Sequence, residues 1–271
     1  MKILRGLWRG ITAVKSALGN IIFLLIVILI AIAVFSSDNV RIDDDTALVL
    51  SPSGVIVEQQ SIIRPFDGLL QQSRKEVVLR DLLKVITHAR NDSRITAMVL
   101  DLSELQGATM GNLEEISTAL TDFKVSGNPV YAFGDEFTQQ QYFLASQADR
   151  IILNKDSFQA LGGVFLTGFG IYPTYYKSAL DKLKVDINVF TSGDYKDAVE
   201  PYLLEGMSEK AKEANSAWLR ELWLIYGNAI TENRGISVES LEDYINSYGS
   251  LLAAAGNDSA QLALNHGFVD E

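Results

Sequence analysis

The stretch ITAMVLDL, residues 95–102, decides the fold class. It is mostly apolar and lacks the alternation of a half-exposed strand, which is typical of a strand buried on both faces of a parallel sheet. Apolar residues at helical spacing precede it at 77–89, and a second helix is expected after it at 113–125. Parallel neighbours need crossover connections, so this stretch and its flanks predict an α/β fold with a largely parallel sheet.

The alternation of strands and helices continues in both directions. A β-rich stretch interrupted by Pro-Ser-Gly lies upstream, at 47–57. Downstream, the pattern predicts strands at 129–133, 150–153 and 185–191, a glycine-spaced stretch at 161–170, and helices at 138–147, 175–183 and from 208 onward. The C-terminal part is therefore predicted to be mainly helical.

An apolar run near the N-terminus predicts a membrane anchor. The run IIFLLIVILIAIAVF, residues 21–35, extends upstream to about residue 17, which gives roughly the 20 residues that a bilayer core requires. Basic residues precede it and acidic residues follow it: Lys2, Arg5, Arg9 and Lys15, then Asp38, Asp43, Asp44 and Asp45. The positive-inside rule then puts the N-terminus in the cytoplasm and the remaining chain outside it. A cleavable signal peptide is the alternative, although Ala33-Val34-Phe35 is a poor cleavage site.

These features predict the domain organisation. Four segments are expected: a cytoplasmic N-terminus at 1–16, a transmembrane anchor at 17–37, a polar acidic linker at 38–46, and one domain at 47–271.

Composition excludes several classes of function. The 34 acidic and 23 basic residues give a net charge of −11, which argues against a nucleic-acid partner because phosphate binding needs a basic surface. There is no cysteine, so disulfides and thiolate chemistry are excluded. The two histidines, His88 and His266, lie far apart and no HExxH spacing exists. We therefore expect neither a metal nor a cofactor.

The segment FTSGDYKDAVEPY, residues 190–202, is the candidate for catalysis. No GxSxG elbow, phosphate-binding loop or serine–histidine pairing exists, so nucleophilic catalysis would need a lysine base. Lys196 follows a predicted strand and turn, and it must be neutral to accept a proton. The alternative is a surface pair between Lys196 and Glu200 on one helix face, and Asp197 would also favour the charged ammonium. Ser192 is interpreted as a turn former beside Gly193.

This segment resembles the lysine motif of the long-form signal peptide peptidase A (protease IV) family. In that motif Tyr-Lys is followed by a small residue and then by Ala-Val-Glu-Pro, and Asp197 departs from it at the small position. The flanks agree as well: YYKSALDKLKV at 175–185, MSEKAKEANSAWLRELW at 207–223, SGVIV at 53–57 and YFLAS at 142–146.

The resemblance implies a crotonase/Clp protease-like β-α-β spiral domain, one of two homologous halves. It implies that the N-terminal half supplies Lys196 as general base and that a C-terminal half supplies the serine. Four copies would enclose the active sites on the outer face of the bacterial cytoplasmic membrane. The substrates would be remnant signal peptides and other apolar peptides.

The resemblance also implies that this chain alone is inactive. Gln139 stands where the catalytic half carries its serine, and Gly107-Ala108 stands where that half carries a glycine pair. Gly162 and Gly163 would border the substrate groove, or would form a simple turn. Two other classes stay open: a membrane-anchored scaffold or binding protein, and an acyl-CoA enzyme of the crotonase type, which the anchor and the lysine motif disfavour.

Overall fold

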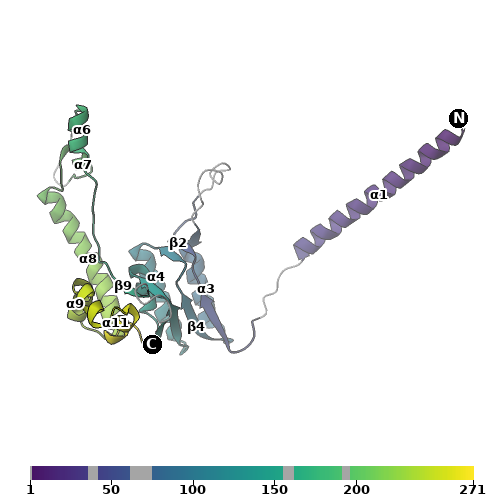
Figure 1. Ribbon diagram of the computed structural model, residues 1–271. Coiled ribbons are helices and arrows are strands. Elements are labelled where there is room, and N and C mark those ends of the chain that lie inside the picture. The colour runs from purple at the N-terminus through teal and green to yellow at the C-terminus, as the bar shows by residue number, and fades with distance from the viewer. Residues whose placement is uncertain (1, 36–41, 62–74, 155–161, 191–195) are drawn as a thin grey trace. The chain divides into compact units, whose positions relative to one another are not determined.

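The N-terminal helix forms a unit of its own. The computed structural model describes residues 2–35, 42–61, 75–154, 162–190 and 196–271 (Figure 1). The chain divides into two units, Met1–Asp43 and Asp44–Glu271. The first contains α1 (Lys2–Phe35), within which Thr12–Ile32 is long and apolar enough to cross a membrane. The predicted N-terminal apolar helix is thus confirmed, while its retention as an uncleaved anchor stays a prediction.

A four-stranded parallel sheet forms the centre of the second unit. Its strands lie in the order β1 (Thr46–Leu50), β4 (Ile95–Asp101), β6 (Val130–Gly134) and β8 (Arg150–Leu153). In the register Met98 pairs with Val130, and Ala132 pairs with Ile151. All four of these side chains are inaccessible to solvent. The buried parallel strand predicted from residues 95–102 is confirmed.

Shorter strands build two further parallel sheets. One has the order β3 (Glu76–Val78), β2 (Gly54–Val57) and β5 (Leu105–Gly107), and the other pairs β7 (Glu136–Thr138) with β9 (Gly163–Phe165). Along the chain a strand of the large sheet is followed by a short strand of a small sheet and then by a helix. The units β4–β5–α4 and β6–β7–α5 follow this order, with α4 spanning Met110–Lys124 and α5 spanning Gln139–Ala145. This repetition is the predicted β-α-β spiral.

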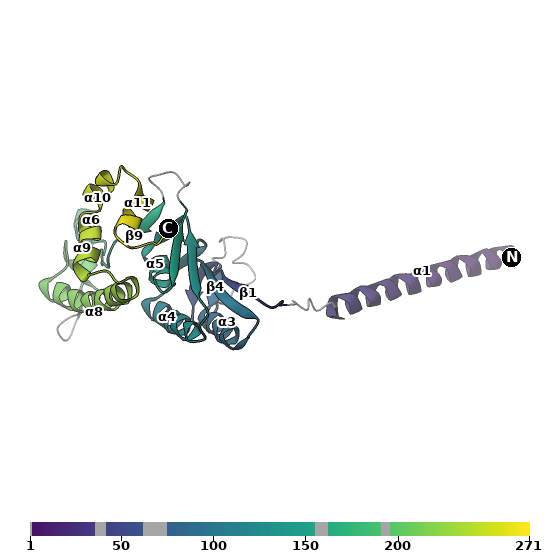
Figure 2. The same ribbon diagram turned by 90° about the horizontal axis from the view of Figure 1, so that it is seen from below.

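Amphipathic helices cover the large sheet. The helix α3 (Leu79–Asn91) buries Leu82, Ile86 and Ala89, which recur at helical spacing. It packs on α4, and the two helices lie together along the sheet (Figure 2). Sequence reasoning placed the start of α3 at residue 77, but residues 76–78 pair with β2 as a strand first.

The predicted helical C-terminal part is confirmed. It consists of α8 (Glu209–Arg234), α9 (Val238–Asn246), α10 (Tyr248–Ala254) and α11 (Ser259–Asn265). Buried tyrosine hydroxyls join this part to the sheets. Tyr142 of α5 donates to the Phe268 carbonyl at 2.7 Å, and Tyr244 of α9 donates to the Val164 carbonyl at 2.9 Å. Burial raises the pKa of the Tyr142 hydroxyl well above its usual value, so it stays a donor.

The last residues of the chain extend the large sheet at its β8 edge. The Asp270 N–H donates to the Ile151 carbonyl at 2.9 Å, and the Leu153 N–H donates to the Glu271 carbonyl at 2.8 Å. The Asp270 carboxylate accepts from Arg234 of α8 at 2.9 Å. Burial alone would raise the pKa of Asp270, but the hydrogen bonds from Arg234 and Ile151 outweigh it and lower the pKa.

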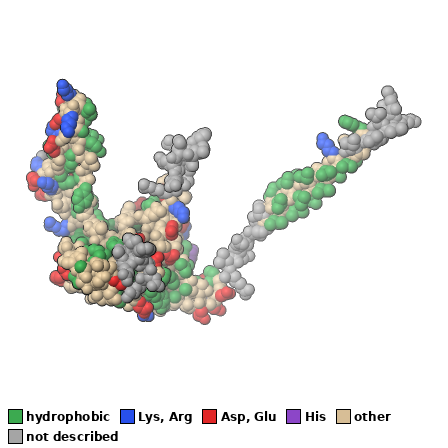
Figure 3. Space-filling model, in the orientation of Figure 1, with side chains coloured by type: hydrophobic (Ala, Val, Ile, Leu, Met, Phe, Trp, Pro, Cys, Tyr) green, Lys and Arg blue, Asp and Glu red, His purple; other side chains and the backbone are tan. Residues whose placement is uncertain are grey.

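Residues 171–206, here called the arm, differ from the rest of the unit. They include α6 (Lys177–Leu183) and α7 (Glu200–Leu203), and none of their described residues is buried. Large apolar side chains are exposed instead, with exposed fractions of 93% for Tyr172, 72% for Leu183 and 99% for Phe190. Figure 3 shows hydrophobic side chains on the surface of this segment.

The strand predicted at 185–191 is wrong for its described residues. Residues 185–190 form no strand, and residue 191 lies outside the described part. A strand needs a neighbour for its backbone hydrogen bonds, and none pairs with 185–190 among the described residues. The apolar pattern here marks an exposed surface rather than a buried strand.

Candidate functional site

Lys196 lies in the arm, just before α7. Its predecessors in the motif, residues 191–195, lie outside the described part, and these include Ser192, Gly193 and Asp194. The backbone after Lys196 is fixed by local hydrogen bonds: the Glu200 N–H donates to the Asp197 carbonyl at 2.9 Å, and the Tyr202 N–H donates to the Val199 carbonyl at 3.0 Å. Pro201 lies in the first turn of α7, where its missing N–H costs nothing. A short helix therefore begins four residues after the lysine, and Pro201 opens it rather than ending it.

The Lys196 side chain is exposed. Among the residues that the structure describes, no ion pair or hydrogen bond engages its ammonium group. The alternative pair with Glu200 on one helix face is wrong, because Lys196 precedes the helix. The Glu200 carboxylate instead accepts from the Ser208 N–H at 3.1 Å, just before α8 begins.

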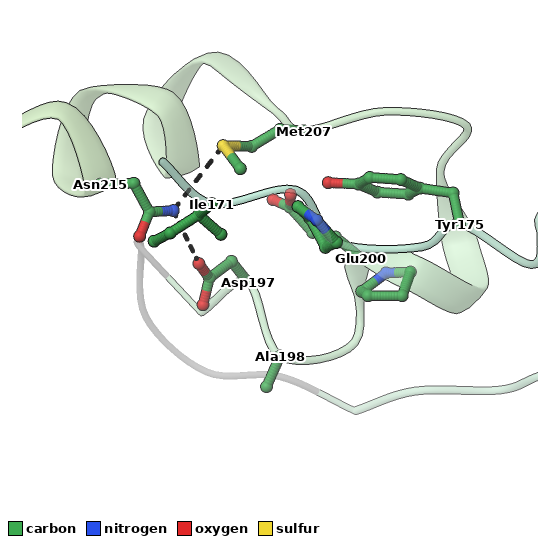
Figure 4. A pocket seen from close by; sticks show the side chains of 9 residues that line it. Ile171, Tyr175, Asp197, Ala198, Glu200, Met207 and Asn215 are labelled. Atoms are coloured by element: carbon green, nitrogen blue, oxygen red, sulfur yellow. Dashed lines mark hydrogen bonds between the residues drawn. The ribbon is translucent and has the colours of Figure 1, made fainter. Parts of the chain in front are cut away.

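A cavity of about 210 Å³ lies beside the lysine segment, between the arm and the start of α8 (Figure 4). Nine side chains line it: Ile171, Pro173, Tyr175, Asp197, Ala198, Glu200, Pro201, Met207 and Asn215. The Asn215 amide nitrogen of α8 donates to the Asp197 carboxylate at 3.4 Å and lies 3.7 Å from the Met207 sulfur. Removal from water, followed by the nearby carboxylates of Glu200 and Asp197, raises the pKa of the Tyr175 hydroxyl.

Gln139 occupies the position where the resemblance expects a serine in the catalytic half. It is the first residue of α5, after the capping residue Thr138, whose hydroxyl accepts from the Gln141 N–H. The side-chain oxygen of Gln139, Oε1, accepts from the Thr167 N–H at 2.9 Å and from the Gly168 N–H at 2.7 Å. Its amide nitrogen donates to the Gly168 carbonyl at 3.2 Å. The side chain thus holds the segment after β9 and offers no nucleophile.

The Gln140 side chain occupies the backbone groups of Ala108, at the position where the resemblance expects a glycine pair in the catalytic half. Its side-chain oxygen accepts from the Ala108 N–H at 3.2 Å, and its amide nitrogen donates to the Ala108 carbonyl at 3.0 Å. An oxyanion site needs backbone N–H groups that are unoccupied when the substrate arrives. The Ala108 N–H is already occupied. A second cavity, of about 520 Å³, opens beside this residue, lined by Val55, Ile56, Val57, Glu58, Gln59, Ala108, Thr109 and Asn112.

Comparison with known proteins identifies the family. The model of Peptidase family S49 matches residues 122–271, which is more than half of the chain and includes Lys196 and both glutamines. The chain belongs to peptidase family S49. Protease 4 of Salmonella typhi is 37% identical over 273 residues, covering 97% of this chain and 43% of that protein. Protease 4 of Haemophilus influenzae is 32% identical over 279 residues, covering 100% of this chain and 45% of that protein.

This S49 chain therefore spans less than half the length of the curated relatives it matches. Among solved structures, an enoyl-CoA hydratase/isomerase family member is similar, with 14% identity and a TM-score of 0.27. The likeness covers 64% of this chain and 74% of that one.

Gly162 and Gly163, the predicted groove residues of this S49 chain, are both buried against α11. The Ser259 hydroxyl donates to the Gly162 carbonyl, and the Gly163 N–H faces the Asp135 carbonyl at 3.3 Å. Gly163 has φ +135°, and a side chain added there would come within 2.9 Å of the Ser259 Cβ. Neither glycine lines the cavity beside Lys196. Packing thus accounts for both glycines, and their role in substrate binding stays a prediction.

Sequence reasoning missed Asn215 and Gln140. Both are amides inside helices, and each acts on a segment far from it in sequence. Asn215 lies in MSEKAKEANSAWLRELW, which contributed to the family resemblance, but no local pattern indicates its contact with Asp197. Gln140 follows Gln139 directly, and the run of three glutamines at 139–141 was the available signal.

Proposed function

We propose that this chain is the lysine-bearing half of a membrane-bound serine endopeptidase that degrades remnant signal peptides. The observation that carries the proposal is the state of Lys196, which is exposed and has no ion-pair partner among the described residues of an S49 chain. A base that completes a site together with another chain segment is expected to be unpaired in its own half.

In the proposed reaction the serine comes from a C-terminal half. Neutral Lys196 accepts the hydroxyl proton as the serine oxygen attacks the scissile carbonyl. The lysine then returns the proton to the leaving amine as the C–N bond breaks, which leaves an acyl-enzyme that water hydrolyses. The engaged amides of Gln139 and Gln140 support a nucleophile from outside this half. The mechanism calls for no cofactor or metal.

The arm is the proposed contact surface for the C-terminal half and for further copies. Tyr172, Leu183 and Phe190 are large, apolar and highly exposed, and large apolar side chains that gather on an exposed surface often mark a protein interface. These exposed side chains support assembly into a homo-oligomer, with a tetramer as the expected state. The measured mass of the assembled protein in detergent would test this number.

The proposed location is the bacterial inner membrane, with α1 as an uncleaved single-pass anchor. The apolar span Thr12–Ile32 and the basic residues before it support an N-terminus in the cytoplasm and a domain on the periplasmic side. Protease added to intact spheroplasts should then cleave the domain, whereas resistance to it would contradict this orientation.

The decisive experiment is hydrolysis of a fluorogenic apolar peptide by this chain with and without a matching C-terminal half. We expect activity only in the mixture, abolished by Lys196→Ala and retained in the control Lys84→Ala, an exposed lysine of α3 outside the arm. Activity of this chain alone would reveal a nucleophile within it and contradict the proposal.

A second candidate function is a membrane-anchored scaffold without catalysis. The engaged glutamine amides favour it, since they leave no nucleophile at the position that the resemblance assigns to serine. A mixture that forms the complex yet hydrolyses nothing would establish this function instead.

A further inference from the structure

Asp197 is the one residue of the lysine motif that departs from the family pattern, and it directly follows Lys196. A carboxylate close to a lysine stabilises the ammonium form, which cannot act as a base. The structure shows where this carboxylate lies. It lines the cavity of about 210 Å³, whereas Lys196 is not among the lining residues (Figure 4).

The Asn215 side chain holds the Asp197 carboxylate on the cavity side. Its amide nitrogen donates to Asp197 Oδ2 at 3.4 Å. Its amide oxygen accepts from the Trp218 indole N–H at 3.0 Å, one turn further along α8. Both ends of the amide are thus engaged. Because α8 also buries Tyr226 and Ile230 near its other end, Asn215 acts from an element fixed to the core.

The other charged groups around Asp197 do not replace this contact. Glu200 of α7 lines the same cavity and repels the Asp197 carboxylate. Tyr175 also faces it, with a pKa raised by removal from water and by both carboxylates. Lys212 of α8 acts in the opposite direction on Tyr175, but its ammonium is bound to Glu209 at 2.7 Å. Asp194 lies outside the described residues.

We propose that Asn215 is a positioning residue for Lys196: by binding Asp197, it prevents an ion pair between these two adjacent side chains. The inference rests on the proposed role of Lys196 as general base. Without the amide, repulsion by Glu200 would favour movement of the Asp197 carboxylate out of the cavity, where the ammonium group of the adjacent residue, Lys196, could pair with it. A small residue at position 197 would make the amide unnecessary.

The pH dependence of kcat/KM tests this role in the full chain combined with its C-terminal half. Activity of a lysine base rises with pH as the ammonium loses its proton. The acid limb is the part of the profile where kcat/KM rises with pH. We expect Asn215→Ala to move this limb to higher pH by about one unit, so that kcat/KM at a given pH on the limb falls about tenfold. The plateau at high pH should stay unchanged. Asn215→Asp, which adds a third carboxylate, should move the limb at least as far.

Two further variants separate positioning from a general structural effect. Adding Asp197→Ser to Asn215→Ala should return the limb to its wild-type position, because the competing carboxylate is gone. Asn228→Ala, an exposed residue of the same helix, serves as the matched control and should change nothing. A uniform loss of activity at all pH values, or a loss that Asp197→Ser does not reverse, would overturn the inference.

The inference and the proposed function fail in different ways. If Lys196→Ala abolishes hydrolysis while Asn215→Ala and Asn215→Asp keep the wild-type pH profile, only the role of Asn215 is wrong. If Lys196→Ala remains active, the role of Lys196 is wrong and the role of Asn215 falls with it.

Discussion

Replacing Gly163 by alanine distinguishes packing from substrate binding at the start of β9. Gly163 has φ +135°, a backbone conformation that residues with a side chain rarely adopt. An alanine Cβ would also approach the Ser259 Cβ to 2.9 Å, and both residues are buried, so there is no open space to relieve the contact.

The expected loss of stability has two parts. Holding alanine at this φ costs about 1–3 kcal/mol, and forcing a methyl group into the packed contact costs about 1–3 kcal/mol more. A combined loss of about 3 kcal/mol would lower the melting temperature by about 6–12 °C in a domain of this size.

Thermal unfolding of the full chain in detergent micelles measures this loss. Gly168→Ala measures the cost of a positive φ without a packing clash, since Gly168 has φ +73° and no atom within 4 Å of an added Cβ, and it should destabilise less than Gly163→Ala. Gly249→Ala, inside α10 with open space around it, should leave stability unchanged or raise it slightly. A Gly163→Ala protein within about 0.5 kcal/mol of the wild type would refute the packing argument. If Gly163→Ala instead raised the KM for peptide hydrolysis without any loss of stability, the predicted role of Gly163 in the substrate groove would be favoured.

Three further expectations concern hydrogen bonds between distant segments of the second unit. Tyr142→Phe leaves the buried Phe268 carbonyl without its donor and should lower the free energy of unfolding by about 1–3 kcal/mol, measured by urea denaturation. The lowered pKa of Asp270 stabilises the fold above roughly pH 4, so that stability should fall as Asp270 gains a proton at lower pH. Asp270→Asn should remove that part of the pH dependence of the melting temperature, and an unchanged acid profile would contradict it. Gln139→Ala should speed hydrogen exchange at the two amides after β9, measured by mass spectrometry, whereas unchanged rates would show that other contacts hold this segment.

The central sheet could be predicted because its signal is local. A buried parallel strand needs apolar side chains on both faces, and the run at 95–102 meets that requirement without reference to the rest of the chain. The strands β5 and β7 were not predicted. Each has three residues, and their pairing with β2 and β9 depends on segments brought together only by the folded chain.

The arm misled sequence reasoning for a related reason. Val185, Ile187 and Phe190 are as apolar as a buried strand requires, but burial depends on what covers a residue. An apolar pattern cannot distinguish a side chain that packs in its own core from one that is exposed until another surface covers it.

Lys196 was singled out from its motif, and its catalytic role stays a prediction. A helix begins at Glu200, four residues after Lys196, because Pro201 suits the first turn of a helix. The contacts of Asn215, Gln139 and Gln140 could not be predicted, since each joins elements distant in the sequence. Their geometry depends on tertiary structure rather than on any spacing of residues.

None of the described residues of the arm is buried, and this has a consequence for the protein in the cell. A segment without a core of its own gains little free energy from staying folded, so a newly made, solitary copy offers it to cellular proteases. Covering the arm would remove that vulnerability. If the proposed C-terminal half covers the arm, assembly would compete with degradation for each new chain, and chains would accumulate only as fast as they find this half.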